Sequence, residues 1–332
     1  MSIDLYGIGN ALVDSEYIVS EAILSQTGFA KGTMTLVDAE ERQQLITLLE
    51  DTANITLSKR AGGGSAANTV VTTALLGGST FYSCKVSNDE TGDFFAQDLS
   101  DLSVASNLAE ARPAGVTGEC ISMITPDGER TLVTHLGITE TLSTAEVDET
   151  LLASAQYLYI EGYLVTSPSA LEAVLKTQAI AQQHGVKVAL TLSDVGLVEN
   201  FKTEFNTLFQ NGVDLVFCNE DEAKLWTGFS DRDQAAQALG GYATSFAMTL
   251  SGDGAIVSGS TGEPVFVPAD RVQALDTTGA GDTFAGGVLY GLARGATLED
   301  ATAHAHLLAK RVVSRFGARL DHQEVLEITG GK

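Results

Sequence analysis

Short apolar segments alternate with amphipathic helical patterns along most of this 332-residue chain. Parallel strands need crossover connections, which are usually helices, so this alternation predicts a mostly parallel sheet with helices on both faces. Strands are expected at Leu5–Gly9, Thr80–Val86, Tyr157–Glu161, Val186–Leu192, Val213–Phe217 and Ala243–Leu250, and helices at Asp38–Leu49, Ala66–Leu76, Glu90–Leu99, Pro168–His184, Gly281–Arg294 and Leu298–Phe316, with one more from Glu220.

Two stretches break the alternation. Val13–Val37 contains strand-like pieces, and Val116–His135 has the pattern of a hairpin turning at Asp127-Gly128. Together they predict a small antiparallel sheet that acts as a lid. We therefore expect a large α/β domain from 1–11, 39–112 and 138–332, and a lid from 12–38 and 113–137.

The charge balance restricts the partners. With 19 Lys and Arg against 43 Asp and Glu, the net charge of −24 disfavours binding to nucleic acid and to anionic membranes. The three cysteines have no metal-ligand spacing, and no apolar run reaches membrane-spanning length. The N-terminus also lacks the basic residues of a signal peptide. These features predict a cytoplasmic protein with unreactive thiols and a small-molecule substrate.

The segment Asp276–Gly287 places small residues before an acid where a helical pattern begins. Unpaired N–H groups at a helix start form an anion site, and Gly279 and Gly281 allow close approach of a ligand. Asp282 would then take a proton from a hydroxyl group while the amides hold a phosphoryl group. An equally plausible alternative is that Asp282 only caps the helix.

A second glycine-rich segment, Ala61–Asn68, also opens a helix. Its Gly62, Gly64 and Ala67 formally match the dinucleotide fingerprint G-x-G-x-x-A. Polar residues precede it where a buried strand should end, so a nicotinamide-dependent oxidoreductase is a minor alternative. An ordinary glycine-rich turn is another.

The two segments together resemble the paired signatures of the ribokinase-like (PfkB) family of carbohydrate and nucleoside kinases. Asn219–Glu222 resembles the family's N-x-x-E element, and Thr249–Gly254 its T-L-G-x-x-G nucleotide loop, with Ser251 replacing the first glycine. The resemblance spans nearly the whole chain. It implies a three-layer α/β fold and phosphoryl transfer from ATP to a hydroxymethyl group. A catalytically inactive binding protein on this fold is a further alternative, which retention of Asp282 disfavours.

The resemblance also implies residue roles. Asp282 is the expected general base, and the amides of Gly279, Ala280 and Gly281 form the anion hole. The expected substrate contacts are Asp14, Gly63, Gly64, Asn68 and Glu161. The expected ATP contacts are Asn219, Glu222, Thr249, Ser251, Gly252, Gly254 and His306. The expected metal contacts are Glu222, which reaches Mg²⁺ through water, and Asp276, Thr278 and Gly317, which adjoin a K⁺ site.

Two of these residues are also suggested by position alone. Asp14 follows the first strand, at the edge where parallel sheets present ligands, and a carboxylate there can accept two sugar hydroxyl hydrogens. Glu161 closes an apolar strand, so it must be paired or functional. A structural hydrogen-bond anchor is the alternative for Glu161.

The phosphate acceptor depends on subtler features. Leu192–Val195 and Gly9–Asp14 are similar to the corresponding segments of the family's adenosine kinases. Apolar lid residues at Leu12, Met34, Leu36 and Leu136 would cover a purine ring, unless they only pack the lid's own core. We therefore expect transfer to the 5′-hydroxyl of a purine nucleoside, with a free sugar such as ribose or fructose as the alternative. A monomer and a homodimer, paired through a lid edge strand, are both compatible with the sequence.

Overall fold

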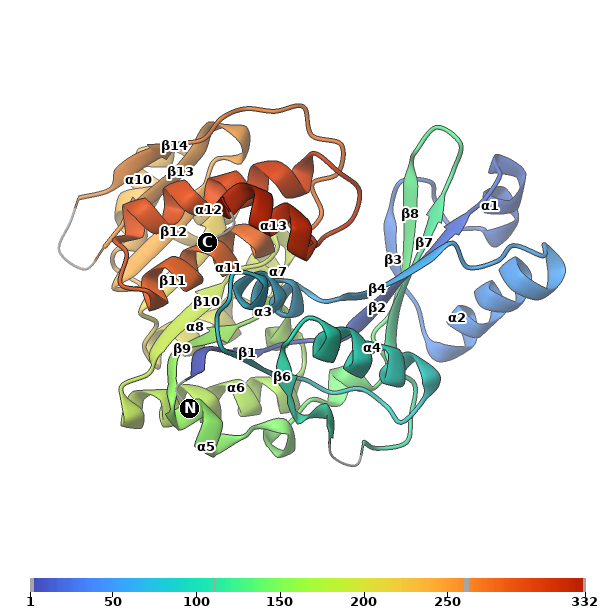
Figure 1. The fold of residues 1–332 in the computed structure, drawn as a ribbon, viewed down its shortest axis with the longest axis horizontal. Helices are drawn as coiled ribbons and strands as arrows, with labels where there is room; N and C mark the ends of the chain where they lie inside the picture. The colour runs from blue at the N-terminus through green and yellow to red at the C-terminus, as the bar shows by residue number, and fades with distance from the viewer. Residues whose placement is uncertain (1–2, 110–111, 260–262, 331–332) are drawn as a thin grey trace.

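The computed structural model describes residues 3–109, 112–259 and 263–330. Its larger sheet has nine strands, of which all neighbours pair in parallel except β12–β13 and β13–β14 (Figure 1). In spatial order these are β14 (Val265–Pro268), β13 (Gly254–Ser258), β12 (Ser245–Thr249), β11 (Leu215–Asn219), β10 (Lys187–Thr191), β9 (Ala155–Ile160), β1 (Ile3–Ile8), β5 (Thr80–Ser83) and β6 (Ala105–Ser106).

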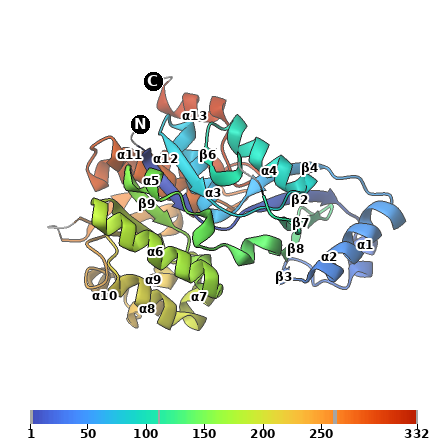
Figure 2. The same ribbon diagram turned by 90° about the horizontal axis from the view of Figure 1, so that it is seen from below.

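Helices cover both faces of this sheet (Figure 2). Alternate residues of one strand, such as Leu158 and Tyr159 of β9, enter two separate hydrophobic cores because side chains alternate along a strand. One layer contains α3 (Ser65–Leu75), α4 (Glu90–Asp101), α11 (Ala280–Ala293) and α12 (Leu298–Val313), with α13 (His322–Thr329) beside α12. The other contains α5 (Glu149–Ala153), α6 (Pro168–His184), α7 (Val195–Asn200), α8 (Lys202–Gln210), α9 (Glu220–Thr227) and α10 (Arg232–Leu239). The predicted mostly parallel, helix-covered sheet is confirmed.

The smaller sheet has the order β3 (Met34–Leu36), β8 (Arg130–His135), β7 (Gly118–Ile124), β2 (Leu12–Ile18) and β4 (Lys59–Gly63). The pair β7–β8 runs antiparallel as expected, and so does β2–β4, but β2–β7 and β3–β8 are parallel. Only β7 and β8 are joined by a tight turn that forces opposite directions. The sheet is therefore mixed.

Two elements from the range 39–112, which was expected to form part of the large domain, lie with this smaller sheet instead. Strand β4 is its edge, although Lys59–Gly63 is polar and glycine-rich. Helix α2 (Ala39–Ile46) packs on the smaller sheet. Its Leu45, and Leu49 in the π-helical turn that follows, share a hydrophobic core with Ile121 and Val133. Helix α1 (Glu21–Thr27), capped by Ser20, covers the same face and was not expected from the sequence. The lid segment 12–38 thus extends in space to include residues 39–52 and 59–63.

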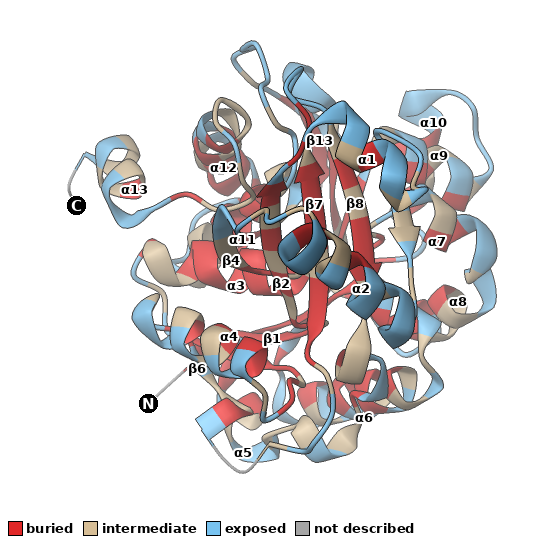
Figure 3. Ribbon diagram, turned by 90° about the vertical axis from the view of Figure 1, so that its right-hand side faces the viewer, coloured by how far each residue is buried: buried red, intermediate tan, exposed pale blue. Residues whose placement is uncertain are grey.

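Buried residues lie along the strands, and exposed residues lie on the outer faces of the helices (Figure 3). Among the described residues, no helix combines the length and apolar content needed to cross a bilayer. The three cysteines are free thiols, and burial raises the pKa of Cys120 to about 12. The last long helix ends at Val313 rather than Phe316, since the chain turns back there toward the start of α11.

Candidate active site

Asp282 lies in the first turn of α11, whose cap residue Gly279 has a φ of +75°. A side chain at Gly279 would stand 2.2 Å from the carbonyl oxygen of Ala318, so only glycine fits there. The amide of Ala280 donates to the carbonyl of Thr277 at 3.2 Å, and the first helical bond runs from Thr283 to Gly279. Within the described part of the chain, the amides of Gly279, Gly281 and Asp282 therefore have no acceptor and remain available to an anion.

The carboxylate of Asp282 is held by two side chains of α3. Ser65 Oγ donates to Oδ1 at 2.6 Å, and Asn68 Nδ2 donates to Oδ2 at 2.9 Å. Burial raises the pKa of Asp282, while these two hydrogen bonds and the charge of Arg319 oppose that rise. The arrangement gives a positioned carboxylate with higher basicity than a solvated one.

The start of α3 depends on Gly64, which has a φ of +99° and no room for a side chain against the carbonyl of Asn10. Glu161, at the end of β9, is 1% exposed and anchors this corner. Its Oε2 accepts from the amide of Ala66 at 2.8 Å, and its Oε1 accepts from Asn10 Nδ2 at 3.0 Å. Burial raises the pKa of Glu161 to about 7. These contacts favour the structural-anchor interpretation of Glu161.

Asp14 lies on β2, and a side chain at Gly63 on the neighbouring strand would come within 2.6 Å of its Oδ2. Burial raises the pKa of Asp14 to about 6. Its carboxylate has no hydrogen bond or ion pair to any of the described residues. An unpartnered, partly buried carboxylate can accept hydrogen bonds from a ligand's hydroxyl groups.

Asn219 and Glu222 form a reciprocal cap at the start of α9. Asn219 Oδ1 accepts from the amide of Glu222 at 2.8 Å, and both oxygens of Glu222 accept from Asn219. Burial raises the pKa of Glu222 to about 7. The motif is therefore folded as a capping box, in which both carboxylate oxygens of Glu222 already accept hydrogen bonds.

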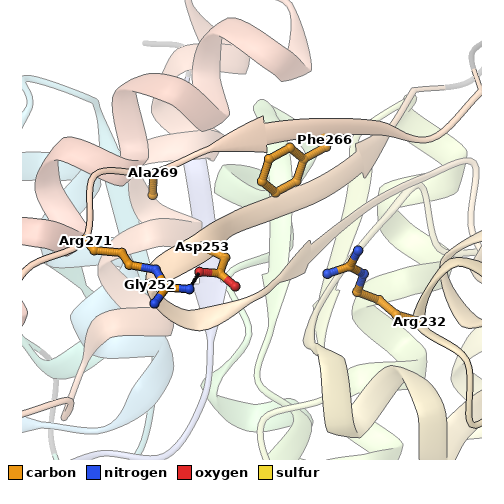
Figure 4. Close-up of a pocket in the computed structure, with 6 residues that line it drawn as sticks. All are labelled: Arg232, Gly252, Asp253, Phe266, Ala269 and Arg271. Atoms are coloured by element: carbon orange, nitrogen blue, oxygen red, sulfur yellow. Dashed lines mark hydrogen bonds and ion pairs between the residues drawn. The ribbon is translucent and has the colours of Figure 1, made fainter.

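The expected nucleotide loop follows β12. Ser251 has a φ of +53°, in the region that favours glycine, and Gly254 has no space for a side chain against the carbonyl of Val267. Thr249 ends β12 beside this turn. A pocket of about 350 Å³ adjoins the loop, lined by Arg232, Gly252, Asp253, Phe266, Ala269 and Arg271 (Figure 4).

His306 is buried on α12. Its ring packs on Phe284 with centroids 5.3 Å apart, and its Nε2 lies 3.3 Å from the carbonyl oxygen of Val267. Burial lowers the pKa of His306, so the ring is neutral at pH 7. The side chain thus joins α12 to β14, the edge strand beside β13.

The residues expected at a K⁺ site are brought together. Asp276 accepts from the amide of Thr278 at 3.0 Å and from the amide of Gly317 at 3.0 Å. Burial alone would raise the pKa of Asp276, but these hydrogen bonds lower it. The loop 315–318 therefore lies against the start of α11.

Sequence reasoning missed three residues of this site. Ser65 donates to Asp282, and Arg319 and Asp98 lie behind Asn68. Ser65 stands inside the second glycine-rich segment, so its position carried a signal. Arg319 and Asp98 belong to no motif, and their meeting depends on tertiary packing alone.

The described residues thus include a buried carboxylate beside a helix start with free amides, an unpartnered carboxylate on the smaller sheet, and a glycine-rich loop beside a pocket. A positioned carboxylate and groups that stabilise negative charge are what phosphoryl transfer needs most. Asp14 on β2 and His306 on α12 make no hydrogen bond to Asp282.

The comparisons with known proteins agree. The model of the pfkB family carbohydrate kinases matches residues 32–324. The structure of a probable sugar kinase from Rhizobium etli is 34% identical, with a TM-score of 0.86 and 100% of both chains covered. That of adenosine kinase from Sinorhizobium meliloti is 33% identical, also with a TM-score of 0.86, over 99% of this chain and 100% of the other. Adenosine kinase from Schizophyllum commune is 29% identical over 98% of each chain. The predicted ribokinase-like fold is confirmed.

Proposed function

Because this chain belongs to the pfkB family of carbohydrate kinases, and is thus a kinase that transfers phosphate to an alcohol group, we propose that its acceptor is the 5′-hydroxyl of a purine nucleoside such as adenosine. Membership implies ATP as the phosphate donor.

An exposed apolar surface on the small sheet supports this proposal most directly. Met34 and Leu36 on β3 are 58% and 59% exposed and take no part in the lid's own core. Helices α1 and α2 cover the opposite face of the sheet (Figure 1). By strand register, Met34 and Leu36 share a face with Leu132 and Thr134 of β8, and so with Asp14 of β2.

That face is directed toward the large domain. Arg130, on the same face, lies with its guanidinium 5.5 Å from the ring centroid of Phe316. A nucleoside whose ribose hydroxyl groups bind Asp14 would therefore extend its base along an apolar surface. Burying a flat base there contributes about 25 cal/mol per Å² of apolar area.

The relatives support this assignment without deciding it. Two solved structures of nearly equal similarity are named as an adenosine kinase and as a probable sugar kinase. A free sugar is therefore the competing acceptor.

The proposed reaction uses Asp282 as the general base. The carboxylate takes the proton of the 5′-hydroxyl, whose oxygen attacks the γ-phosphorus of ATP, and the bond from that phosphorus to the ADP oxygen breaks. The amides of Gly279, Gly281 and Asp282 stabilise the transferred phosphoryl group. The amide of Ala280 would first have to leave the carbonyl of Thr277.

ATP binds enzymes as its Mg²⁺ complex, in which the ion keeps several waters and needs one or two protein carboxylates. The described residues contain no cluster of three or more potential metal ligands, and Glu222 already accepts from Asn219 with both oxygens. This donor set fits an ion held by the nucleotide phosphates, with Glu222 acting through water. The loop formed by Asp276, Thr278 and Gly317 would offer carbonyl groups to K⁺.

The test is a comparison of kcat/KM, measured as ADP release, for adenosine, inosine, guanosine, ribose and fructose. Phosphorus NMR of the product identifies the phosphorylated hydroxyl. 5′-Deoxyadenosine, which lacks the acceptor oxygen, serves as the control. We expect a nucleoside to exceed both sugars by at least about tenfold, or about 1.4 kcal/mol. A free sugar preferred by that margin would refute the nucleoside assignment.

Variants test the observation itself. Met34→Ser and Leu36→Ser should lower kcat/KM for the nucleoside more than for ribose. Leu307→Ser, which changes a 43% exposed leucine on α12, is the matched control. Equal losses for nucleoside and ribose would show that the apolar surface does not bind a base.

A further inference from the structure

Arg319 joins three segments that are distant in sequence. Its Nε donates to Asn68 Oδ1 on α3 at 2.7 Å, and its Nη1 donates to Asp98 Oδ2 on α4 at 2.6 Å. The Arg319 side chain is 11% exposed, and that of Asp98 is 22% exposed. Such a buried, two-point contact fixes both the guanidinium and the group that accepts from it.

The contact determines which way the Asn68 carboxamide faces. Because its oxygen accepts from Arg319, its NH₂ group is directed at Asp282 Oδ2, 2.9 Å away. A reversed amide would set an oxygen against the Asp282 carboxylate and an NH₂ group against the guanidinium. Both contacts would then be repulsive.

We propose that Arg319 is a positioning residue for phosphoryl transfer, which acts by holding the Asn68 amide so that it donates to Asp282. This role rests on the proposed function, in which Asp282 is the base.

The charge of Arg319 also acts on Asp282, because it favours the ionised carboxylate. Burial raises the pKa of Asp282, and the positive charge of Arg319 counters that effect. Asp98 accepts a hydrogen bond from only one nitrogen of the Arg319 guanidinium. The other terminal nitrogen, Arg319 Nη2, is buried and has no hydrogen-bond partner among the described residues. Glu161, Tyr82, Tyr159 and Tyr163 also interact electrostatically with Asp282. Arg319 is the cation among these groups.

Strand β4 makes room for this arrangement at Gly62. A side chain there would come within 2.2 Å of Asp98 Oδ2 and 2.9 Å of Arg319 Nη1. Gly62→Ala therefore displaces the ion pair without changing Arg319, Asn68 or Asp282. It is an independent way to disturb the same contact.

The first experiment measures kcat and KM against pH for Arg319→Gln, Arg319→Lys and Gly62→Ala. We expect Arg319→Gln to lower kcat by roughly ten- to hundredfold, as small misplacements of catalytic groups do, with the acid limb of the profile moved to higher pH and the KM for ATP unchanged. Arg319→Lys keeps the charge but not the forked donor geometry, so it should recover part of kcat. Gly62→Ala should move the acid limb as Arg319→Gln does.

Arg42→Gln is the matched control, since it breaks another buried ion pair, with Glu119 on the lid. It should lower stability without moving the acid limb. In an Asn68→Ala background, Arg319→Gln should have little further effect on kcat, because the two residues act in series. Equal effects in both backgrounds would overturn the proposed route through Asn68.

The second experiment does not depend on turnover. The side-chain carboxyl of Asp282 is titrated by carbon NMR in the free enzyme, its signal being assigned by loss in Asp282→Asn. Arg319→Gln should raise the apparent pKa, and Arg42→Gln should not. An unchanged titration overturns the proposal, even if Arg319→Gln is less active. Absence of nucleoside phosphorylation in the wild type would instead refute the proposed function, and the titration would still decide the role of Arg319.

Discussion

The Asp282 carboxylate and the Asn68 carboxamide meet at 2.9 Å although 214 positions separate them in the chain. Each stands in the first turn of a helix that begins at a glycine with positive φ, Gly279 for α11 and Gly64 for α3. The two glycine-rich segments therefore form two sides of one site. Their contact places a buried carboxylate beside free helix-start amides, and the proposed phosphoryl transfer depends on this arrangement.

Asp14→Ala should raise KM for the phosphate acceptor far more than KM for ATP. Hydrogen bonds to a charged group are worth about 1.5–3 kcal/mol, or roughly ten- to hundredfold in affinity. Steady-state kinetics with each substrate varied in turn provide the measurement, and Asp51→Ala, at an exposed position, is the control. Equal increases in both KM values would place Asp14 outside the acceptor site.

Ser251→Gly should stabilise the protein. Ser251 has a φ of +53°, a conformation that costs a non-glycine residue about 1–2 kcal/mol, whereas the extra freedom of glycine in the unfolded chain costs about 0.5–1 kcal/mol. We expect a net rise of about 0.5–1 kcal/mol in the free energy of unfolding, measured with urea. Ser251→Ala, which keeps the strain, should give no rise. If alanine stabilises as much as glycine, backbone strain is not the cause.

Glu161 should make stability depend on pH. Its pKa rises from 4.5 to about 7 on folding, mainly through burial. Between these values the folded state binds more protons than the unfolded state, so this group's contribution to stability falls as pH rises. Glu161→Gln removes the titration and should gain stability relative to wild type between pH 5 and pH 8.

Urea unfolding of both proteins at the two pH values tests this, with Glu172→Gln, at an exposed position on α6, as the control. If the stability of wild type relative to Glu161→Gln increases as pH rises, the hydrogen bonds from Asn10 and Ala66 outweigh the effect of burial.

Much of the fold was predictable because its periodic patterns are local. Pro168–His184 has its bounds set by a proline at the start and Gly185 at the end, and the structure has the same bounds. The helix expected from Asp38 is present as α2, with Asp38 as its N-cap. Strand β4 was not predicted, since Lys59–Gly63 lacks apolar alternation and is stabilised by pairing with β2. The parallel β2–β7 pairing also joins distant segments and leaves no local signal.

Some residues of the candidate site were likewise predictable from the local sequence, and others were not. Asp282 and Asn68 stand in glycine-rich segments whose composition already indicated ligand loops. Arg319 and Asp98 lie in no such segment. They meet across 221 positions of the chain, so the local sequence gives no signal for their contact. The alternative interpretation of Glu161 as an anchor also needed the structure, which shows the hydrogen bonds from Asn10 and Ala66 that occupy its carboxylate.

Asp282 is proposed to be the base that deprotonates the acceptor hydroxyl. Asp282→Asn keeps the shape, and its amide oxygen can accept from Asn68 Nδ2 while its NH₂ group donates to Ser65 Oγ, so the fold and the KM for ATP should be preserved. The decisive measurement is kcat for ADP release with a saturating acceptor at pH 7. We predict a decrease of at least about 10²-fold, the lower end of general-base contributions. A folded Asp282→Asn protein with near wild-type kcat would contradict the claim.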